Sequence, residues 1–267
     1  MTKEFWNSRA SSEKTTGYSD YSVAFFDQLM RLKVIERVLD EYIALDLKKA
    51  TVLDFGCGKG DFVSYFSDKV AFVVGYDISQ EILELARENC ANISNVLLTN
   101  SLNEIDLEFD VVLSVTVMQH ILDDNELSSV LSVLSTKCKQ NAVVAALETL
   151  ECNGFDLPAL PHLKVRKLED LAALFERSDF RIVSVRPFYN PFLIRTPSYI
   201  EYRKKVRLFR YAYRLIGKSG ANPAIFNGVF KRRAEDVLSK EQNIDGLIEG
   251  KSFSNIIIIK KGAHGSP

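Results

Sequence analysis

The chain has 267 residues, of which 46% are hydrophobic and 26% charged, with 13 glycines and 7 prolines. This composition is that of a globular protein with a sizeable core, and it excludes disordered and fibrous classes. The 34 basic and 35 acidic side chains give a formal net charge of -1, which argues against a protein that binds polyanions over its whole surface.

The cysteines and the first residues indicate the cellular setting. The four cysteines lie far apart and form no C-x-x-C pair, so neither a zinc cluster nor a disulfide framework is expected. The N-terminus carries charge where a signal peptide is apolar, and no stretch approaches the roughly 18 apolar residues of a membrane span. We therefore expect a cytoplasmic protein without a metal site, and a peripheral contact with a membrane surface is left open.

The N-terminal region precedes the regular part of the chain. Residues 1–22 are polar and rich in Ser and Thr, with a few aromatic side chains, which suggests an arm that folds over a ligand. From Val23 to about Leu45 apolar residues recur at helical spacing, which predicts one amphipathic helix or two. Residues 1–47 are therefore expected to form an arm and helix that serve as a lid.

From residue 48 onward, short apolar runs alternate with helical stretches, the pattern of a parallel sheet covered by helices on both faces. Helical patterns occupy about 60–68, 79–91, 125–138 and Lys167–Ser178. The predicted strands are Thr51–Phe55, Phe72–Asp77, Asn95–Thr99, Asp110–Val115, Ala142–Leu147, Phe180–Arg186 and Asn255–Lys260. The fold class is α/β.

The segment 188–254 departs from this rhythm, because it places about 65 residues between the sixth and seventh strands, where a hairpin would suffice. Residues 191–235 contain eleven basic and two acidic side chains. A continuous helix over 199–216 would place four arginines on one face: Arg203, Arg207, Arg210 and Arg214. The side away from them is predicted to be apolar: Val206, Phe209, Tyr213 and Ile216, with Leu208, Ala212 and Leu215.

Such a basic amphipathic helix has several uses. It is typical of contact with anionic lipid, a phosphorylated substrate, an acidic carrier protein or nucleic acid. It also fits a helix that packs its apolar side on the domain and leaves its arginines in solvent.

The most informative motif is Asp54-Phe55-Gly56-Cys57-Gly58-Lys59-Gly60, which we call the glycine loop (residues 54–60). Glycines at alternate positions after a strand allow a tight turn and a close approach of backbone to ligand. The second strand ends in another acid, Asp77. Because the carboxyl ends of these two strands are neighbours in a doubly wound sheet, Asp77 is placed to accept hydrogen bonds from two ribose hydroxyls.

Other nucleotide-binding motifs fit this loop less well. A P-loop requires Gly where Asp54 stands and Ser or Thr where Gly60 stands. A dinucleotide fingerprint requires a third glycine at the position of Asp61, whose charge would be unfavourable beside a pyrophosphate. The loop therefore predicts a nucleoside ligand without phosphates, and an NAD-dependent oxidoreductase is a disfavoured alternative.

The glycine loop, Asp77, Phe109-Asp110-Val111-Val112 and Gln119-His120-Ile121 resemble the motifs of class I S-adenosylmethionine-dependent methyltransferases. The resemblance spans roughly 48–186 and the last strand, 255–260. It implies a Rossmann-like seven-stranded sheet with an antiparallel last strand, with 48–187 plus 255–262 as the cofactor-binding core and 188–254 as a substrate cap.

The resemblance also implies S-adenosylmethionine as the cofactor. Its methionine part is then held by Asp54, Gly56, Cys57, Gly58 and Gly60, and its ribose by Asp77. Ile78 and Val115, beside the second and fourth strands, are further candidate contacts. The family's acid after the third strand is missing, so the adenine contact is expected from Asn100 or Ser101.

Candidate catalytic residues follow from location. His120 lies just past the fourth strand, and its imidazole titrates in the range of a general base for a hydroxyl or protonated amine acceptor; packing of the loop or a substrate contact explains it equally well. Glu148, at the end of the fifth strand, is a weaker candidate to face the acceptor, with a helix cap or a surface carboxylate as alternatives.

The remaining candidates lie in the arm, the loop and the linkers. In the N-terminal arm, Arg9 and Tyr18 are candidates for holding the cofactor's carboxylate, although Arg9 also fits a solvated surface charge. Cys57 is expected to be a small filler, and His162 and His264 to have surface roles.

The expected function is S-adenosylmethionine-dependent methylation, at oxygen, of a small or carrier-linked acceptor, anionic or neutral, such as a sugar, a glycolipid or another metabolite. An RNA methyltransferase is an alternative that lacks an aromatic-basic RNA signature. A non-catalytic scaffold that binds the cofactor is a second alternative, suggested by the missing adenine-site acid.

Overall fold

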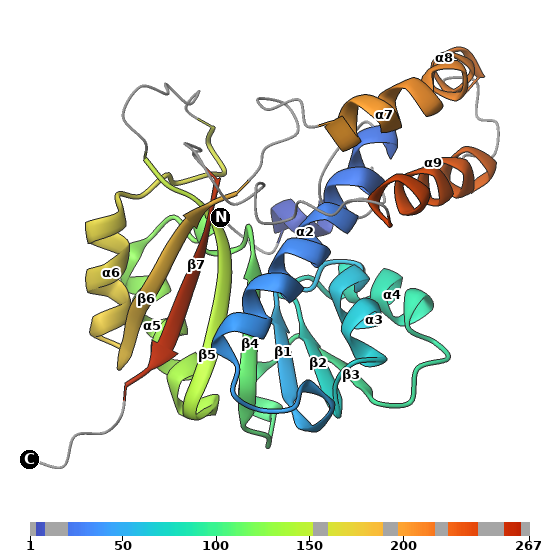
Figure 1. The fold of residues 1–267 in the computed structure, drawn as a ribbon. Coiled ribbons are helices and arrows are strands. Elements are labelled where there is room, and N and C mark those ends of the chain that lie inside the picture. Colours follow the sequence, from blue (N-terminus) through green and yellow to red (C-terminus); the bar gives the residue numbers. More distant parts are fainter. Residues whose placement is uncertain are drawn as a thin grey trace, which may run out of the picture. The chain divides into compact units, whose positions relative to one another are not determined.

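The computed structural model describes residues 4–8, 21–151, 160–188, 197–216, 224–239 and 254–262. The chain divides into two compact units, a core unit (Met1–Thr16, Leu39–Phe188 and Gly250–Pro267) and a second unit (Gly17–Val38 and Tyr189–Glu249). The strands, coloured along the chain in Figure 1, are β1 (Thr51–Phe55), β2 (Phe72–Tyr76), β3 (Val96–Thr99), β4 (Phe109–Val115), β5 (Cys138–Thr149), β6 (Phe180–Pro187) and β7 (Ser254–Lys261).

Helices alternate with these strands. The α-helices are α2 (Tyr21–Tyr42), α3 (Asp61–Ser67), α4 (Gln80–Asn89), α5 (Asp124–Lys137), α6 (Leu168–Glu176), α7 (Pro197–Lys205), α8 (Arg207–Ile216) and α9 (Ala224–Leu238). Short 3-10 helices are η1 (Leu47–Lys49), η2 (Leu102–Glu104) and η3 (Met118–His120). In the segments that the structure describes, no helix has the length and apolar character needed to cross a bilayer.

Within the described residues, the strands form one seven-stranded sheet in the order β3-β2-β1-β4-β5-β7-β6. Strands β1 to β5 pair in parallel, and β7 runs antiparallel between β5 and β6. The order reverses between β1 and β4, so a ligand crevice is expected at the carboxyl ends of these two strands. The α/β fold with an antiparallel last strand is thus confirmed.

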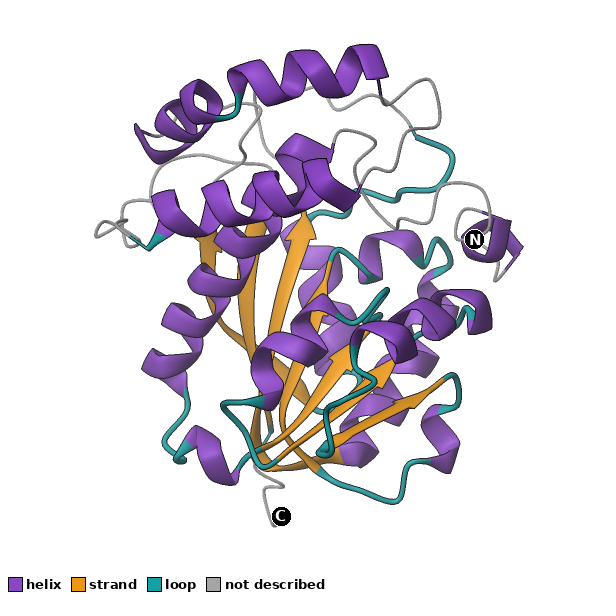
Figure 2. Cartoon of the chain, turned by 90° about the vertical axis from the view of Figure 1, so that its right-hand side faces the viewer, coloured by secondary structure: helices purple, strands orange, loops and turns teal. Residues whose placement is uncertain are grey.

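Burial on both faces explains the apolar strands. One face packs against α5 and α6 and contains Leu53, Val112, Val144 and Ile257, all at most 1% exposed. The connections from β1 to β2 and from β4 to β5 are both right-handed, but they lead toward opposite edges of the sheet. They therefore place α3 and α5 on opposite faces. Figure 2 shows the resulting layers of the core unit, with helices flanking the twisted sheet.

Several element boundaries differ from the predicted ones. The predicted strand Ala142–Leu147 lies inside the longer β5, because Cys138 already pairs with Phe109 before an irregularity in the ladder. The predicted helix from Val23 to about Leu45 is α2, whose end is bound to β6 through the ion pair of Glu41 with Arg186, with 2.5 Å between Oε2 and Nη2.

The second unit contains α7, α8, α9 and most of α2. The ring of Phe26 in α2 stacks on that of Tyr202 in α7, with 5.0 Å between centroids, and Lys205 Nζ lies 2.7 Å from Asp236 Oδ2 in α9. Residues 21–38 of α2 therefore pack with the insertion, whereas the sequence prediction sets 1–47 apart as an arm. The lid and cap roles stay predictions.

The single helix predicted over 199–216 is wrong, because α7 ends at Lys205 and α8 begins at Arg207. Val206, between them, is fully buried, as is Tyr202 one turn earlier, so burial fixes the chain at the junction. The alignment of four arginines requires an uninterrupted helix. Arg203 thus belongs to a different helix from Arg207, Arg210 and Arg214.

Candidate functional site

The glycine loop joins β1 to α3 and adopts a backbone that favours glycine. Gly56, Gly58 and Gly60 have φ angles of 79°, 54° and 83°. The N–H groups of Gly56 and Cys57 both donate to the carbonyl oxygen of Tyr76 at 2.8 Å, which fastens the loop to β2. A Cβ atom at Gly56 would lie 2.4 Å from Val117 Cγ2, so a side chain is excluded there. The loop is therefore held between the ends of β2 and β4.

Asp54, on β1 at the base of the loop, is 2% exposed. Among the residues that the structure describes, its Oδ2 atom is buried and has no hydrogen-bond partner. Burial, and then the nearby carboxylates of Asp77 and Asp61, raise the pKa of Asp54 to about 8. Because a buried acceptor without a donor costs about 1–3 kcal/mol, this atom indicates a ligand that brings a donor or a positive charge.

Asp77 follows β2 and is also buried. Its Oδ2 accepts a hydrogen bond from Gly58 N at 3.0 Å, and its Oδ1 accepts one from Ser79 N at 3.0 Å. Burial raises the pKa of Asp77, and these two N–H donors oppose the increase. These hydrogen bonds give Asp77 a second role, which is to hold the glycine loop. Each carboxylate oxygen retains a further lone pair, so Asp77 can hold the loop and still accept hydrogen bonds from a ribose.

The other predicted cofactor contacts are placed unevenly. Ile78 and Asn100 are exposed, whereas Ser101 and Val115 are half-buried. The third strand is tied to the same edge, because Asp77 N donates to Thr99 O at 3.2 Å and Ser101 N donates to Thr99 Oγ1 at 3.1 Å. The binding roles of these four residues stay predictions. Arg9 and Tyr18 lie outside the described residues, as does His264.

The segment 116–121, which we call the post-β4 turn, brings His120 to the carboxyl edge of the sheet. His120 Nδ1 lies 2.6 Å from the carbonyl oxygen of His162, and their rings stack at 5.7 Å between centroids. Phe5 stacks on His162, and Trp6 contacts His120 edge-on. The expected surface role of His162 is therefore wrong: its ring lies between two aromatic side chains that are far from it in sequence.

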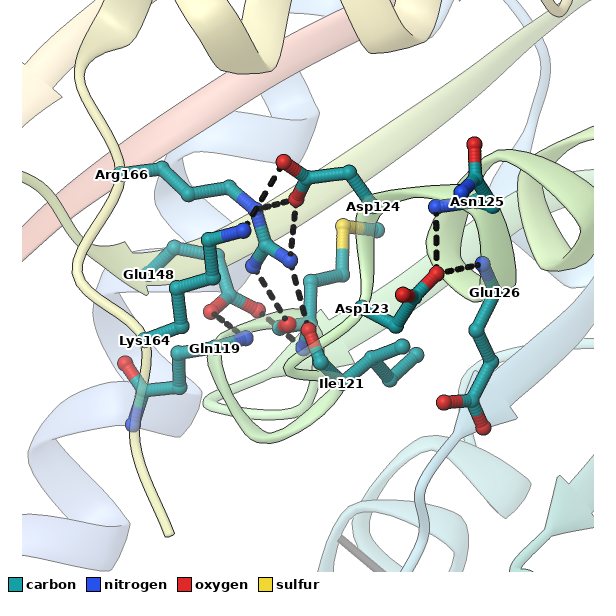
Figure 3. Close-up of polar contacts among 10 residues, drawn as sticks. Gln119, Ile121, Asp123, Asp124, Asn125, Glu126, Glu148, Lys164 and Arg166 are labelled. Atoms are coloured by element: carbon teal, nitrogen blue, oxygen red, sulfur yellow. Dashed lines mark hydrogen bonds and ion pairs between the residues drawn. The ribbon is translucent and has the colours of Figure 1, made fainter. Parts of the chain in front are cut away.

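Glu148, at the end of β5, is 3% exposed and bonded to backbone. Its Oε1 accepts hydrogen bonds from Val117 N at 3.1 Å and Met118 N at 3.0 Å. Its Oε2 accepts one from Gln119 N at 3.0 Å, and Figure 3 shows Glu148 beside Gln119. These contacts contradict the weaker prediction, that Glu148 faces the acceptor, because both oxygens are already bound inside the fold. Glu148 is not the N-cap residue of η3, which is Val117, but its carboxylate receives the N–H groups at the start of this helix.

Two further residues have structural rather than chemical roles. Cys57 is buried, which raises the pKa of its thiol well above the usual value, as expected of a filler rather than a reactive group. Asp110, part of the sequence motif, lies at the opposite edge, where its Oδ2 accepts from Thr51 N and Lys139 Nζ, each at 2.8 Å. A motif residue thus joins β1 to β4 without entering the site.

A family profile described as a methyltransferase domain matches residues 52–141, which carry the glycine loop, Asp77 and the post-β4 turn. These residues therefore form a methyltransferase domain, in agreement with the resemblance to class I S-adenosylmethionine-dependent methyltransferases. The family's cofactor is S-adenosylmethionine, and the site fits it: the orphaned oxygen of Asp54 suits a cationic ligand, and glycines with positive φ angles at positions 56, 58 and 60 leave no side chain at alternate positions of the loop.

Relatives among characterised proteins support this assignment over part of the chain. The cyclopropane-fatty-acyl-phospholipid synthase of Escherichia coli K12 is 29% identical over 108 residues, 39% of this chain and 28% of that protein. The ubiquinone biosynthesis O-methyltransferase of Brucella melitensis is 28% identical over 157 residues, 52% of this chain and 63% of that protein. The chain thus spans less than two thirds of either relative.

Solved structures extend the likeness of fold to most of the chain. A phosphoethanolamine N-methyltransferase of Haemonchus contortus superposes with a TM-score of 0.61 at 15% identity, covering 99% of this chain and 61% of that one. A putative sarcosine dimethylglycine methyltransferase of Galdieria sulphuraria gives a TM-score of 0.56 at 18% identity, covering 88% and 86%. At these identities the likeness concerns the fold alone.

Proposed function

We propose that this chain catalyses methyl transfer from S-adenosylmethionine to an oxygen atom of a small or carrier-linked acceptor. The observation that carries the proposal is Asp54 Oδ2, a buried acceptor without a partner among the described residues, beside the glycine loop at the point where the strand order reverses. A buried acceptor beside a loop with glycine at alternate positions is the arrangement that a cationic, phosphate-free cofactor needs.

Each element of the site has a separate task in this proposal. S-adenosylmethionine, when bound, supplies an electrophilic methyl group on a positively charged sulfur. Asp54 and the glycine loop hold the methionine end, and Asp77 accepts hydrogen bonds from the ribose while it keeps Gly58 in place. Because positioning of the reactants supplies most of the rate acceleration in such displacements, a rigid loop itself contributes to catalysis.

His120 is the proposed general base. A carbonyl oxygen only accepts hydrogen bonds, so the 2.6 Å contact with His162 O requires a proton on His120 Nδ1. The neutral ring therefore carries its lone pair on Nε2, the atom that would take the proton of an acceptor hydroxyl. The relative from Brucella melitensis is named an O-methyltransferase, which supports oxygen as the atom methylated.

Calorimetry with S-adenosylmethionine and with NAD tests the cofactor. We expect heat with the former only, and absence of that heat would overturn the proposal. Asp77→Ala should weaken the binding at least about tenfold, because it removes hydrogen bonds to a charged group. A methyl-transfer screen over sugars, glycolipids, other metabolites and RNA then tests catalysis. Binding without transfer to any acceptor would favour the scaffold alternative.

His120→Ala separates catalysis from binding. It should lower turnover by about 10²-fold or more and leave the affinity for S-adenosylmethionine nearly unchanged, since the His120 ring packs against His162 and Trp6. Unchanged turnover would remove His120 from the mechanism.

We further propose that the second unit binds an anionic lipid surface. In α8, Leu208 and Tyr211 are 79% and 67% exposed, and Phe209 is exposed as well. Of the apolar side expected from the sequence, Leu208 and Phe209 are thus exposed, whereas Val206 is buried. Exposed Lys204 and Arg207 lie beside them in sequence. Apolar and aromatic side chains next to cations are typical of a helix that lies in a membrane interface. The relative from Escherichia coli is named for a fatty-acyl phospholipid.

Flotation of the full chain with lipid vesicles tests this partner. We expect binding to vesicles of phosphatidylcholine mixed with phosphatidylglycerol, and none to phosphatidylcholine alone. Leu208→Glu should reduce binding by about 10-fold or more, since it removes one inserted leucine and adds a repelled charge. Leu107→Glu, at an exposed leucine of the core unit, is the matched control and should bind as wild type does. Equal binding by both variants, or binding to RNA alone, would overturn the proposal.

A further inference from the structure

The post-β4 turn is held from two sides by opposite charges, as Figure 3 shows. On the N–H side, the Glu148 carboxylate receives three successive backbone donors from residues 117–119. On the carbonyl side, the buried guanidinium of Arg166 donates from Nη1 to Met118 O at 3.1 Å and from Nη2 to Ile121 O at 2.6 Å. The charges match the dipole of η3, because an anion stabilises its N-terminal end and a cation its carbonyl end.

The two charged groups are themselves fixed. Arg166 Nε donates to Asp124 Oδ1 at 2.9 Å, and Lys164 Nζ lies 2.8 Å from Asp124 Oδ2. Burial raises the pKa of Glu148 to about 7, while the three N–H donors and Arg166 oppose the increase. A carboxylate is costly to bury at this position. We therefore expect Glu148 to have a role other than filling the end of β5.

The turn that these charges hold is strained and touches the glycine loop. Thr116, its first residue, has a φ angle of 57°, a conformation that a β-branched residue rarely adopts. Val117, the next residue, lies so close to Gly56 that a Cβ atom there would come 2.4 Å from Val117 Cγ2. The carboxylate that fixes Val117 N thereby also fixes the side chain that borders the glycine loop.

We propose that Glu148 is a positioning residue that holds the post-β4 turn in its strained form and, through Val117, sets the glycine loop for cofactor binding. The inference rests on the proposed function only for the effect on cofactor binding, because the contacts of Glu148 with the turn are present without a ligand. Glu148 acts through backbone N–H groups and Val117. It links the turn that bears His120 to the loop that receives the cofactor.

Amide hydrogen exchange of the ligand-free protein tests the contacts. In Glu148→Gln an NH2 group, which donates, replaces one of the two accepting oxygens. Exchange at Val117, Met118 and Gln119 should therefore accelerate by about 10- to 100-fold. Exchange at Gly56 and Cys57 should accelerate by about threefold or more if the loop is coupled. Amides in the middle of β4 and β5 should keep their protection, which shows that the variant is folded. Glu151→Gln, the same change at an exposed glutamate three residues later, is the matched control.

Glu148→Asp gives a graded second test, because it keeps the charge but shortens the side chain by one methylene. We expect it to lie between wild type and Glu148→Gln in exchange at residues 117–119 and in affinity for S-adenosylmethionine, which should fall about fivefold or more in Glu148→Gln. Wild-type exchange at Gly56 and Cys57 in both variants, together with an unchanged affinity, would overturn the positioning role. If wild type itself binds no S-adenosylmethionine, the proposed function fails, and the exchange rates still decide the inference.

Discussion

The glycine loop and the post-β4 turn meet at Gly56 and Val117, and each is organised around a buried carboxylate. Asp54 in the loop has an oxygen atom without a partner among the described residues, whereas Glu148 has both oxygens bound to backbone N–H groups. Burial raises the pKa of both side chains, so the shift alone does not distinguish them. The hydrogen bonds do: an unsatisfied carboxylate indicates a place for a ligand, and a satisfied one indicates a device that holds the fold.

The largest effect is expected where the two regions touch. Gly56→Ala places a methyl group 2.4 Å from Val117 Cγ2 on a backbone with a φ angle of 79°. We expect a loss of about 2–5 kcal/mol in the free energy of unfolding and no detectable binding of S-adenosylmethionine by calorimetry. Gly228→Ala is the control, since nothing lies within 4 Å of the added methyl group in α9. It should be neutral or stabilising by about 0.5–1 kcal/mol. Normal binding by Gly56→Ala would show that the two regions are independent.

A smaller effect is expected from removing the charge of the unsatisfied carboxylate. Asp54→Asn should weaken the binding of S-adenosylmethionine by about 10- to 100-fold, because it removes an anionic acceptor from a cationic ligand. It should not lower the melting temperature of the ligand-free protein, because a buried carboxyl group with an unpaired oxygen does not stabilise the fold. Asp68→Asn, at an exposed position after α3, serves as the control. A loss of stability without a loss of affinity would place Asp54 with Glu148 as a residue that holds the fold.

The smallest effect is the dependence of stability on pH. The pKa is raised from 3.8 to about 8 for Asp54 and from 4.5 to about 7 for Glu148. The folded chain therefore keeps protons that the unfolded chain has released, so stability should fall as the pH rises from about 5 to 8. Asp77, Asp61 and Cys57 surround Asp54, and Arg166 lies near Glu148, so these groups share the titration.

Thermal melts at several pH values measure this effect. Ligand-free wild type should melt a few degrees lower at pH 8 than at pH 5, and Asp54→Asn should show a flatter profile. Bound S-adenosylmethionine should also flatten it, because a cationic ligand favours the ionised form of Asp54. A melting temperature that rises over this range would contradict the assigned directions.

Local patterns in the chain were sufficient to predict the α/β fold, the order of strands and helices, the glycine loop and the acids at the ends of β1 and β2. These features follow from the period of apolar residues and from glycines where the backbone needs positive φ angles, and both are written in consecutive residues. The same patterns predicted a single helix over 199–216. That prediction was wrong because the burial of Tyr202 and Val206 depends on packing in the second unit.

The roles of Glu148, Arg166 and His162 depend on residues that are distant in sequence. Glu148 is bound to amides about 30 residues away, Arg166 to carbonyl groups about 45 residues away, and His162 O to His120. No periodicity or motif records such partners, because they are chosen by the way the strands and loops pack. The sequence thus shows which cofactor the chain is built for, and the packed structure shows which of its buried carboxylates has room to receive it.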